Sequence, residues 1–263
     1  MREAVIVSGV RTGGGRAPRG TLRDTRPEFL GKLCMEAAIQ RLGPGFSAEM
    51  IDDVIWGCAT PEQVCGLNTA RVTALYAGIP ESVPAVTINR FCSSGLQAEA
   101  FAAEAIMCGR CDVVVAGGVE HMSLISMGGV IRPNPQIALD PVLGNIYTSM
   151  GQTAEYVASR YGVSRADQDQ FAVASRQKAA AATREGRFKD EIVASHQKAA
   201  AATREGRFKD EIVAVPVSIT TLGGDGQLST QEMVFDYDEG IRGDVSVEGL
   251  GKLKSAFVPG GTV

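Results

Sequence analysis

The chain has 263 residues, of which 44% are hydrophobic and 21% charged, and its 26 basic and 30 acidic side chains leave a net charge of −4. This length and balance predict a globular protein of one large or two modest domains and argue against disordered and fibrous classes. Because the chain lacks the basic surface of a nucleic-acid binder, we expect no nucleic-acid partner. Its apolar runs fall far short of the roughly 20 residues that a membrane helix needs, so we expect no membrane span.

The cysteines indicate the compartment. No long apolar stretch of a secretory signal stands near the first residue. In a chain of this size, the cysteines are therefore interpreted as reduced thiols rather than as a disulfide framework. We expect a cytoplasmic protein with free thiols at Cys34, Cys58, Cys65, Cys92, Cys108 and Cys111.

Short apolar runs alternate with helical patterns in the first part of the chain. The runs predict strands that are buried on both faces, and the amphipathic stretches predict helices between them. The expected strands are 4–8, 53–56, 85–89 and 112–116, and the expected helices are 27–42, 67–77 and 93–107. This alternation is typical of a parallel sheet covered by helices. Residues 121–150 lose the periodicity, a helical pattern resumes near residue 151, and a last helix is expected over 247–256.

A segment of twenty residues occurs twice in tandem, as 175–194 and 195–214, and the copies differ only at Arg176 and His196. Natural solenoids have at least three diverged repeats with atypical ends, so this pattern indicates a recent duplication instead. In one continuous helix the second copy would turn its apolar face by about 200°. We therefore expect one copy to loop out or repack, and we do not expect a functional array.

Two local motifs resemble known sites but lack essential parts. In the loop 11–20, Pro18 occupies the place of the third glycine of a dinucleotide-binding loop, and no lysine follows Gly20 as a P-loop requires. We expect a flexible, basic surface loop. Cys108 and Cys111 form a lone CxxC at the end of a predicted helix, where the dipole disfavours a thiolate. Without a second pair for zinc, we expect no metal site.

Cys92 stands between the predicted strand 85–89 and the predicted helix 93–107. Open α/β sheets place ligands at the carboxyl ends of their strands. The unpaired N–H groups and the dipole of a helix N-terminus favour a thiolate nucleophile. Cys92 is therefore a candidate nucleophile, and the alternative is a buried, inert cysteine. His121 would approach Cys92 if the strands before them are neighbours, whereas His196 is expected to be a solvated helix residue.

The sequence around Cys92 reads INRFCSSGLQA over 88–98, which resembles the nucleophile motif of thiolases in the form typical of degradative 3-ketoacyl-CoA thiolases. The resemblance runs through nearly the whole chain, at 7–12, 116–123, 149–155, 206–212 and 250–263. It implies two similar α/β halves with a loop domain inserted in the first half. This chain would then be the N-terminal half, with a mixed, mainly parallel sheet and helices on both faces. Residues 1–118 and 235–263 would form its α/β domain, and residues 119–234 the inserted loop domain that contains the duplication.

The thiolase resemblance also implies a reaction. The nucleophile Cys92 attacks the keto carbon of a 3-ketoacyl-CoA, acetyl-CoA leaves, and CoA takes the acyl group from the cysteine. The Cys92 N–H would contribute to an oxyanion hole. By the same resemblance, Met150 matches a residue near the acyl pocket and Arg242 a basic residue on the CoA side. Coenzyme A is then a substrate rather than a bound cofactor, and the complete protein would be a homodimer or homotetramer in fatty-acid metabolism.

The chain also departs from the family pattern. The family's base is a histidine in a Gly-His-Pro motif, and its second acid/base is a cysteine before a glycine-rich stretch. Neither motif is present here, nor is the asparagine that positions a water, and His121 is not the family's base. A second 20-residue copy is a further departure. We therefore expect a fragment with little turnover alone. The alternatives are a biosynthetic acetyl-CoA C-acetyltransferase, a condensing enzyme of the wider superfamily, and a non-catalytic acyl-CoA-binding or assembly partner.

Overall fold

The computed structural model describes residues 2–127, 129–184, 212–222, 224, 226–236, 239 and 245–263. The chain divides into two compact units, of which the first comprises 1–129 with 207–239 and the second 130–206 with 240–263. The division into an α/β domain and an inserted loop domain that the thiolase resemblance implies stays a prediction.

A parallel sheet of three strands forms the centre of the first unit, in the order β3-β2-β4. Its strands are β2 (Asp53–Gly57), β3 (Ala85–Ile88) and β4 (Val114–Gly118). All five residues of the central strand β2 are buried, as its continuous apolar run predicts. The observed strands lie within two residues of the expected ones, which is the usual uncertainty of strand ends.

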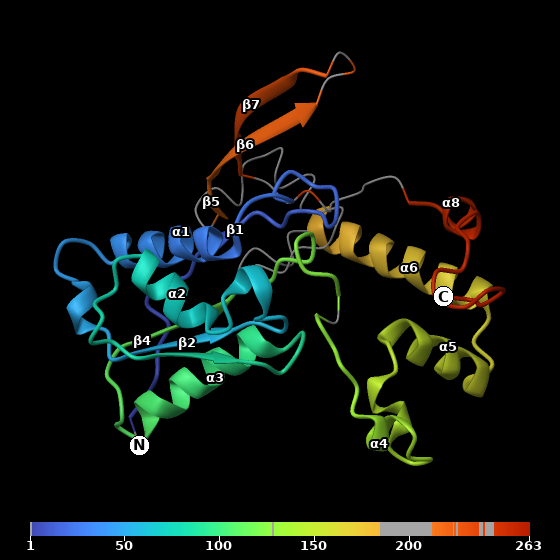
Figure 1. Cartoon of the computed structure of the whole chain (residues 1–263), viewed down its shortest axis with the longest axis horizontal. Helices are drawn as coiled ribbons and strands as arrows, with labels where there is room; N and C mark the ends of the chain where they lie inside the picture. Colours follow the sequence, from blue (N-terminus) through green and yellow to red (C-terminus); the bar gives the residue numbers. More distant parts are fainter. Residues whose placement is uncertain are drawn as a thin grey trace. The chain divides into compact units, whose positions relative to one another are not determined.

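Helices cover both faces of this sheet (Figure 1). The helices are α1 (Pro27–Gln40), α2 (Thr69–Tyr76) and α3 (Ser94–Met107). Successive side chains of a strand point to opposite faces. Val54 and Trp56 of β2 accordingly join a core cluster with residues of α1 and α2, whereas Ile55 packs with Ala98 and Ala102 of α3. The predicted α/β fold with helices on both faces is confirmed.

The expected strand over residues 4–8 is wrong. Val5, Ile6 and Val7 are 67%, 86% and 71% exposed and belong to no strand. A β-branched run is stable as a strand only where a neighbouring strand takes up its hydrogen bonds and packs its side chains. Here residues 4–12 and Val113–Val119 line a hollow of about 700 Å³ instead of forming a ladder. The pairing begins only at β1 (Arg11–Thr12), which is parallel to β5 (Ile212–Val213).

An antiparallel hairpin of β6 (Val215–Leu222) and β7 (Leu228–Phe235) completes the first unit. Val215, Val217 and Phe235 are buried in one cluster with Leu22 and Leu30. Sequence reasoning did not predict this hairpin. Short 3₁₀ turns lie at Ala48–Met50 and Gln63–Cys65 in this unit and at Gly144–Tyr147 in the second unit.

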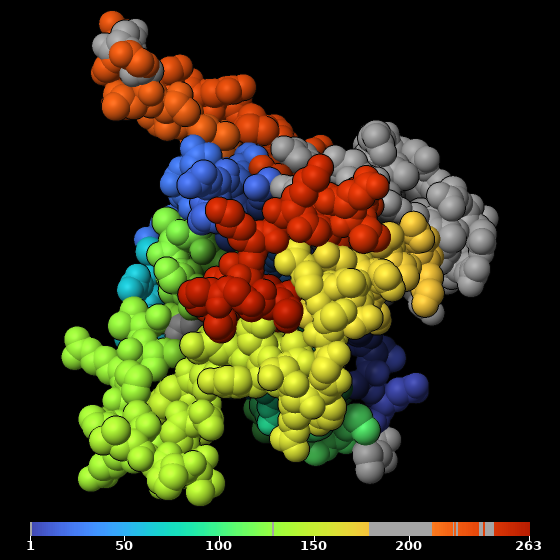
Figure 2. Space-filling view, turned by 90° about the vertical axis from the view of Figure 1, so that its right-hand side faces the viewer, coloured from blue at the N-terminus to red at the C-terminus, as the bar shows by residue number. Residues whose placement is uncertain are grey.

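The second unit is helical, with α4 (Pro135–Ala138), α5 (Met150–Tyr161), α6 (Arg165–Arg184) and α8 (Val247–Gly251). Glu155 of α5 accepts hydrogen bonds from the backbone N–H groups of Thr262 and Val263, both at 2.9 Å. Figure 2 shows the C-terminal segment of the chain, in red, against the yellow segment that contains α5 and α6. The last helix is shorter than the predicted 247–256.

Most of the tandem duplication, with His196, lies outside the described residues. The described start of the first copy, up to Arg184, continues the helix α6. Among the helices that the structure describes, none is both long and apolar enough to cross a membrane.

Candidate active site at the Cys92 turn

Cys92 lies in the turn that joins the end of β3, at Ile88, to the start of α3, at Ser94. Its side chain is exposed. Gly57, at the end of the neighbouring strand β2, packs so closely on this turn that an added Cβ would lie 2.5 Å from the Ser94 carbonyl carbon. The structure therefore places Cys92 at the carboxyl edge of a parallel sheet and before a helix N-terminus, as the sequence predicts.

Serine side chains stabilise this turn from within. The hydroxyl of the buried Ser94 accepts a hydrogen bond from the Arg90 N–H at 2.9 Å and donates one to the Phe91 carbonyl at 2.6 Å. The Ser93 hydroxyl donates to the Arg90 carbonyl at 2.9 Å. Phe91 has a φ of +47°, in the left-handed region that a residue with a Cβ adopts only at a cost of roughly 1–3 kcal/mol. The two serines after Cys92 thus help to offset the strain of the residue before it.

Sequence reasoning missed two polar side chains near the turn. Asn89 bonds both to the Phe91 N–H and to the Ala59 carbonyl. Glu120, which follows β4, accepts hydrogen bonds from the N–H groups of Ala59 and Thr60. An asparagine directly after a strand is a signal for a side-chain-stabilised turn and would have indicated the first of these contacts.

His121 is a buried residue whose ring contacts backbone groups rather than Cys92. The strand β2 lies between β3 and β4, so the strands before Cys92 and His121 are not neighbours, and the condition under which His121 would approach Cys92 is not met. The His121 ring is buried, its Nδ1 accepts from the Leu124 N–H at 3.2 Å, and its Nε2 lies 3.1 Å from the Leu22 carbonyl. Both nitrogens are therefore engaged by backbone groups, with the proton on Nε2. In the described part of the chain, no carboxylate or imidazole is hydrogen-bonded to the Cys92 sulfur.

Four of the five other thiols are less exposed than Cys92. Cys58, Cys65 and Cys111 are buried, and Cys34 is half-buried. A hydrogen bond to Cys58 and burial raise the pKa of Cys65 far above its ordinary value, and burial raises the pKa of Cys111. Cys108 is exposed but caps the C-terminal end of α3. The two exposed thiols therefore stand at opposite ends of one helix, and Cys92 is at the end that favours an anion.

The glycine-rich loop 11–20 binds a carboxylate of its own chain. Glu239 accepts hydrogen bonds from the backbone N–H groups of Arg16, at 2.9 Å, and Thr21, at 3.0 Å. It also accepts one from the Thr21 hydroxyl at 2.8 Å. The loop that was expected to be a flexible surface segment is thus tied to a residue more than 200 positions away.

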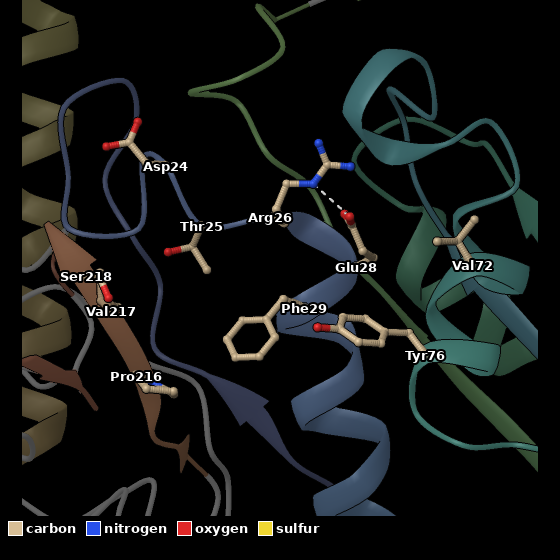
Figure 3. Close-up of a pocket in the computed structure, with 10 residues that line it drawn as sticks. All are labelled: Asp24, Thr25, Arg26, Glu28, Phe29, Val72, Tyr76, Pro216, Val217 and Ser218. Atoms are coloured by element: carbon tan, nitrogen blue, oxygen red, sulfur yellow. Dashed lines mark hydrogen bonds and ion pairs between the residues drawn. The ribbon is translucent and has the colours of Figure 1, made fainter. Parts of the chain in front are cut away.

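A second hollow, of about 540 Å³, lies between the start of α1, helix α2 and strand β6 (Figure 3). Arg26 pairs with Glu28 at its wall, with an N–O distance of 2.7 Å, and the rings of Phe29 and Tyr76 lie beside this pair. Its lining contains no cysteine or histidine. The hollow therefore offers neither a thiol nucleophile nor an imidazole base, and the Cys92 turn remains the candidate active site.

The two other residues of the predicted site are not joined to Cys92 by the described structure. Met150 belongs to the second unit, where it is the first residue of α5 and 72% exposed. Arg242 lies outside the described residues. Their substrate-binding roles stay predictions.

Comparison with known families shows which family the chain belongs to. The model of the thiolase N-terminal domain matches residues 4–194 and 193–263, so that the two matched segments meet where the two copies of the duplication join. The chain belongs to the thiolase family. The resemblance inferred from the sequence is thereby confirmed, and Cys92 lies within the first matched segment.

The chain is similar over its whole length to longer thiolases. It is 48% identical to a 3-ketoacyl-CoA thiolase of Bacillus subtilis (strain 168) and 41% identical to one of Pseudoalteromonas translucida (strain TAC 125). It spans 61% and 60% of these two relatives. The crystal structure of Bacillus anthracis acetyl-CoA acetyltransferase matches with a TM-score of 0.68 and 32% identity, over all of this chain and 61% of that one. The chain thus has the fold of a thiolase N-terminal domain and is about three fifths as long as these relatives.

Proposed function

We propose that this chain carries the nucleophile of a thiolase that cleaves 3-ketoacyl-CoA with coenzyme A. The observation that carries the proposal is the position of Cys92. It is an exposed thiol in a strand–turn–helix segment at the carboxyl edge of the sheet, within a chain that belongs to the thiolase family. Its relatives are named 3-ketoacyl-CoA thiolases, which supports thiolysis of a 3-ketoacyl-CoA as the reaction.

The chemistry needs one nucleophile and two proton transfers. The Cys92 thiolate adds to the keto carbon of the substrate, and the bond between the α and β carbons then breaks. The electron pair goes to the departing acetyl-CoA, which takes up a proton. The thiol of CoA then gives its proton to a base, which replaces the proton taken up by acetyl-CoA. The resulting CoA thiolate attacks the acyl thioester, so that a shortened acyl-CoA leaves and the Cys92 thiolate is restored. The N-terminus of α3 would stabilise negative charge on the cysteine and on the adjacent oxyanion.

The activity of a whole thiolase is proposed only for the longer protein that the relatives represent. This chain has no Gly-His-Pro sequence, and both nitrogens of its described histidine are engaged by backbone groups. The proposal therefore includes low turnover by this chain alone. It also includes Met150 at the acyl pocket, Arg242 on the CoA side, a homodimeric or homotetrameric assembly, and a cytoplasmic location.

A second candidate is biosynthetic condensation, in which the same cysteine is first acetylated by acetyl-CoA. The similarity to Bacillus anthracis acetyl-CoA acetyltransferase favours this candidate. The two reactions share the acyl-cysteine and differ in direction and in the acyl chain that they accept. A third candidate, a non-catalytic acyl-CoA-binding partner, requires no acylated cysteine at all.

Acyl transfer to the purified chain separates the two candidates that form an acyl-cysteine from the non-catalytic one. We expect acetyl-CoA and acetoacetyl-CoA to leave an acetyl group on Cys92, located by peptide mass spectrometry, and the Cys92→Ser chain to remain unmodified. With CoA present, we expect turnover of acetoacetyl-CoA at least ~10²–10⁴-fold below that of the complete Bacillus subtilis relative, because the proton-transfer partners are missing. Equal acetylation of Cys108 would contradict the nucleophile assignment. Turnover at the rate of the complete enzyme would contradict the predicted need for further residues.

A further inference from the structure

Asn89 is the first residue after β3, and its side chain bridges two segments of the first unit. Its Nδ2 donates a hydrogen bond to the Ala59 carbonyl at 2.9 Å, just past the end of β2. Its Oδ1 accepts a hydrogen bond from the Phe91 N–H, also at 2.9 Å. One amide therefore links the end of the central strand to the residue immediately before Cys92.

The backbone N–H of Ala59 is also hydrogen-bonded, to a side chain other than Asn89. The Ala59 N–H donates to Glu120 at 2.8 Å, and the Thr60 N–H donates to the other oxygen of the same carboxylate at 3.1 Å. Glu120 follows the strand β4. The backbone of Ala59 is thus fixed between a side chain from the end of β3 and a side chain from the end of β4. The three segments that leave the carboxyl edge of the sheet are tied together beside the turn.

The hydrogen bond from the Phe91 N–H to Asn89 is the contact through which Ala59 and Glu120 are linked to the turn. Phe91 has a left-handed φ of +47°, which directs the chain into the Cys92 position. The serine contacts within the turn involve the Arg90 N–H and the carbonyls of Arg90 and Phe91, but not the Phe91 N–H. The Asn89 side chain accepts the hydrogen bond from the Phe91 N–H. Through its second hydrogen bond, to the Ala59 carbonyl, it connects the turn to the sheet.

We infer that Asn89 is a positioning residue for Cys92, acting with Ala59 and Glu120 as a tether. The inference rests on the proposed role of Cys92 as the nucleophile. The tether holds the sulfur at the N-terminal end of α3, where the helix favours the thiolate. An amide that only stabilised the fold would alter the unfolding midpoint without changing how one thiol reacts relative to another.

The test uses the full chain and iodoacetamide as the probe, with the alkylation rate of each cysteine followed by peptide mass spectrometry. Cys108 is the internal reference because it is exposed at the opposite end of the same helix. We expect Asn89→Ala to lower the rate at Cys92 about three- to tenfold at neutral pH, the effect of losing one or two modest hydrogen bonds. The rate at Cys108 should not change.

Two further variants separate positioning from general stability. Asn89→Ser keeps an uncharged acceptor for the Phe91 N–H, since a serine forms the same kind of turn more weakly, but it cannot reach Ala59. We expect it to restore part of the Cys92 rate. Glu120→Gln should lower the Cys92 rate in the parent chain and have little further effect in the Asn89→Ala chain, because residues of one network are not additive.

The outcomes are distinct from those that test the proposed function. A folded Asn89→Ala chain with an unchanged or faster Cys92 rate would overturn the inference, as would parallel losses at Cys92 and Cys108. If the Asn89 and Glu120 substitutions lower the Cys92 alkylation rate additively, the two residues do not act together through Ala59, and that part of the inference would be overturned. If Asn89→Ala does not fold, the Asn89→Ser and Glu120→Gln rates decide the question alone. The proposed function stands or falls separately, on acylation of Cys92 in the unsubstituted chain.

Discussion

Ser94 contributes a buried hydroxyl whose two hydrogen bonds lie inside the Cys92 turn. We expect Ser94→Ala to lower the free energy of unfolding by about 1–3 kcal/mol, because it leaves the Arg90 N–H and the Phe91 carbonyl without this partner. Chemical denaturation followed by circular dichroism measures the change. Ser93→Ala is the matched control, since it removes the same group from an exposed position with one bond to Arg90. Equal losses in the two variants would contradict the importance of the buried hydroxyl.

Glu239 gives the chain a pH-dependent contact. Burial opposes its ionisation, but hydrogen bonds from Arg16 and Thr21 outweigh this effect and hold the pKa of Glu239 below its ordinary value of 4.5. A carboxyl group whose pKa is lower in the folded than in the unfolded protein contributes its full stabilisation at pH values above the unfolded-state pKa. That contribution is lost as the pH falls through the folded-state pKa. Glu239 therefore contributes at neutral pH and not in strong acid.

Glu239→Gln tests this linkage. At pH 7 we expect the variant to lose about 1 kcal/mol of unfolding free energy, near the low end for hydrogen bonds to a charged group because the site is partly solvated. The difference from the parent chain should shrink as the pH is lowered below 4.5. Denaturant midpoints at several pH values provide the measurement. A difference that stays constant with pH would show that the carboxylate charge is not the cause.

At the scale of the elements, β2 and α3 are in close backbone contact at Gly57. A Cβ at Gly57 would lie 2.5 Å from the Ser94 carbonyl carbon, and backbone atoms cannot move aside cheaply. We expect Gly57→Ala to destabilise the chain by about 1–3 kcal/mol through overpacking and to slow alkylation of Cys92. Gly45→Ala is the control, because nothing lies within 4 Å of a Cβ at that position. If the Gly57→Ala chain is as stable as the control, α3 moves away from β2 without a loss of unfolding free energy, and the prediction is contradicted.

The sheet and its helices are predictable from the sequence because their signals are local. The strand β2 has a continuous apolar run, and α1 begins with Pro27 at its first turn, a position that suits proline. The location of Cys92 between a strand and a helix follows from the same local patterns. Predicting these elements does not require knowing which strands are neighbours.

What the sequence did not predict depends on contacts between distant residues. The strand order places β2 between β3 and β4, which separates the turns that hold Cys92 and His121. The partner of the glycine-rich loop, Glu239, lies too far along the chain for any local signal. The run at 4–8 has the composition of a strand, but strand formation requires a partner that composition does not reveal.

At the scale of the whole molecule, exposed apolar side chains have a measurable consequence. Val5, Ile6 and Val7 form a continuous exposed run. Contiguous exposed apolar surface promotes association, so we expect the purified chain to self-associate as its concentration rises. Ile6→Lys should weaken that association severalfold in sedimentation velocity experiments.

A change in net charge is controlled separately. Glu3→Gln raises the net charge by the same amount as Ile6→Lys and alters an exposed side chain nearby. We expect it to leave the association unchanged. If both variants associate less, the change in charge is the cause, and the apolar run is not.

The three strands of the sheet, helices α2 and α3 and the Cys92 turn all come from one uninterrupted stretch, residues 53–118. Contacts between residues close in sequence form early in folding, and segments made first on the ribosome fold first. We therefore expect the part of the chain that presents Cys92 to fold before the duplicated segment, 175–214, has been synthesised. A duplication at that place would then leave the assembly of the nucleophile's surroundings unchanged, so that the chain would still expose its cysteine.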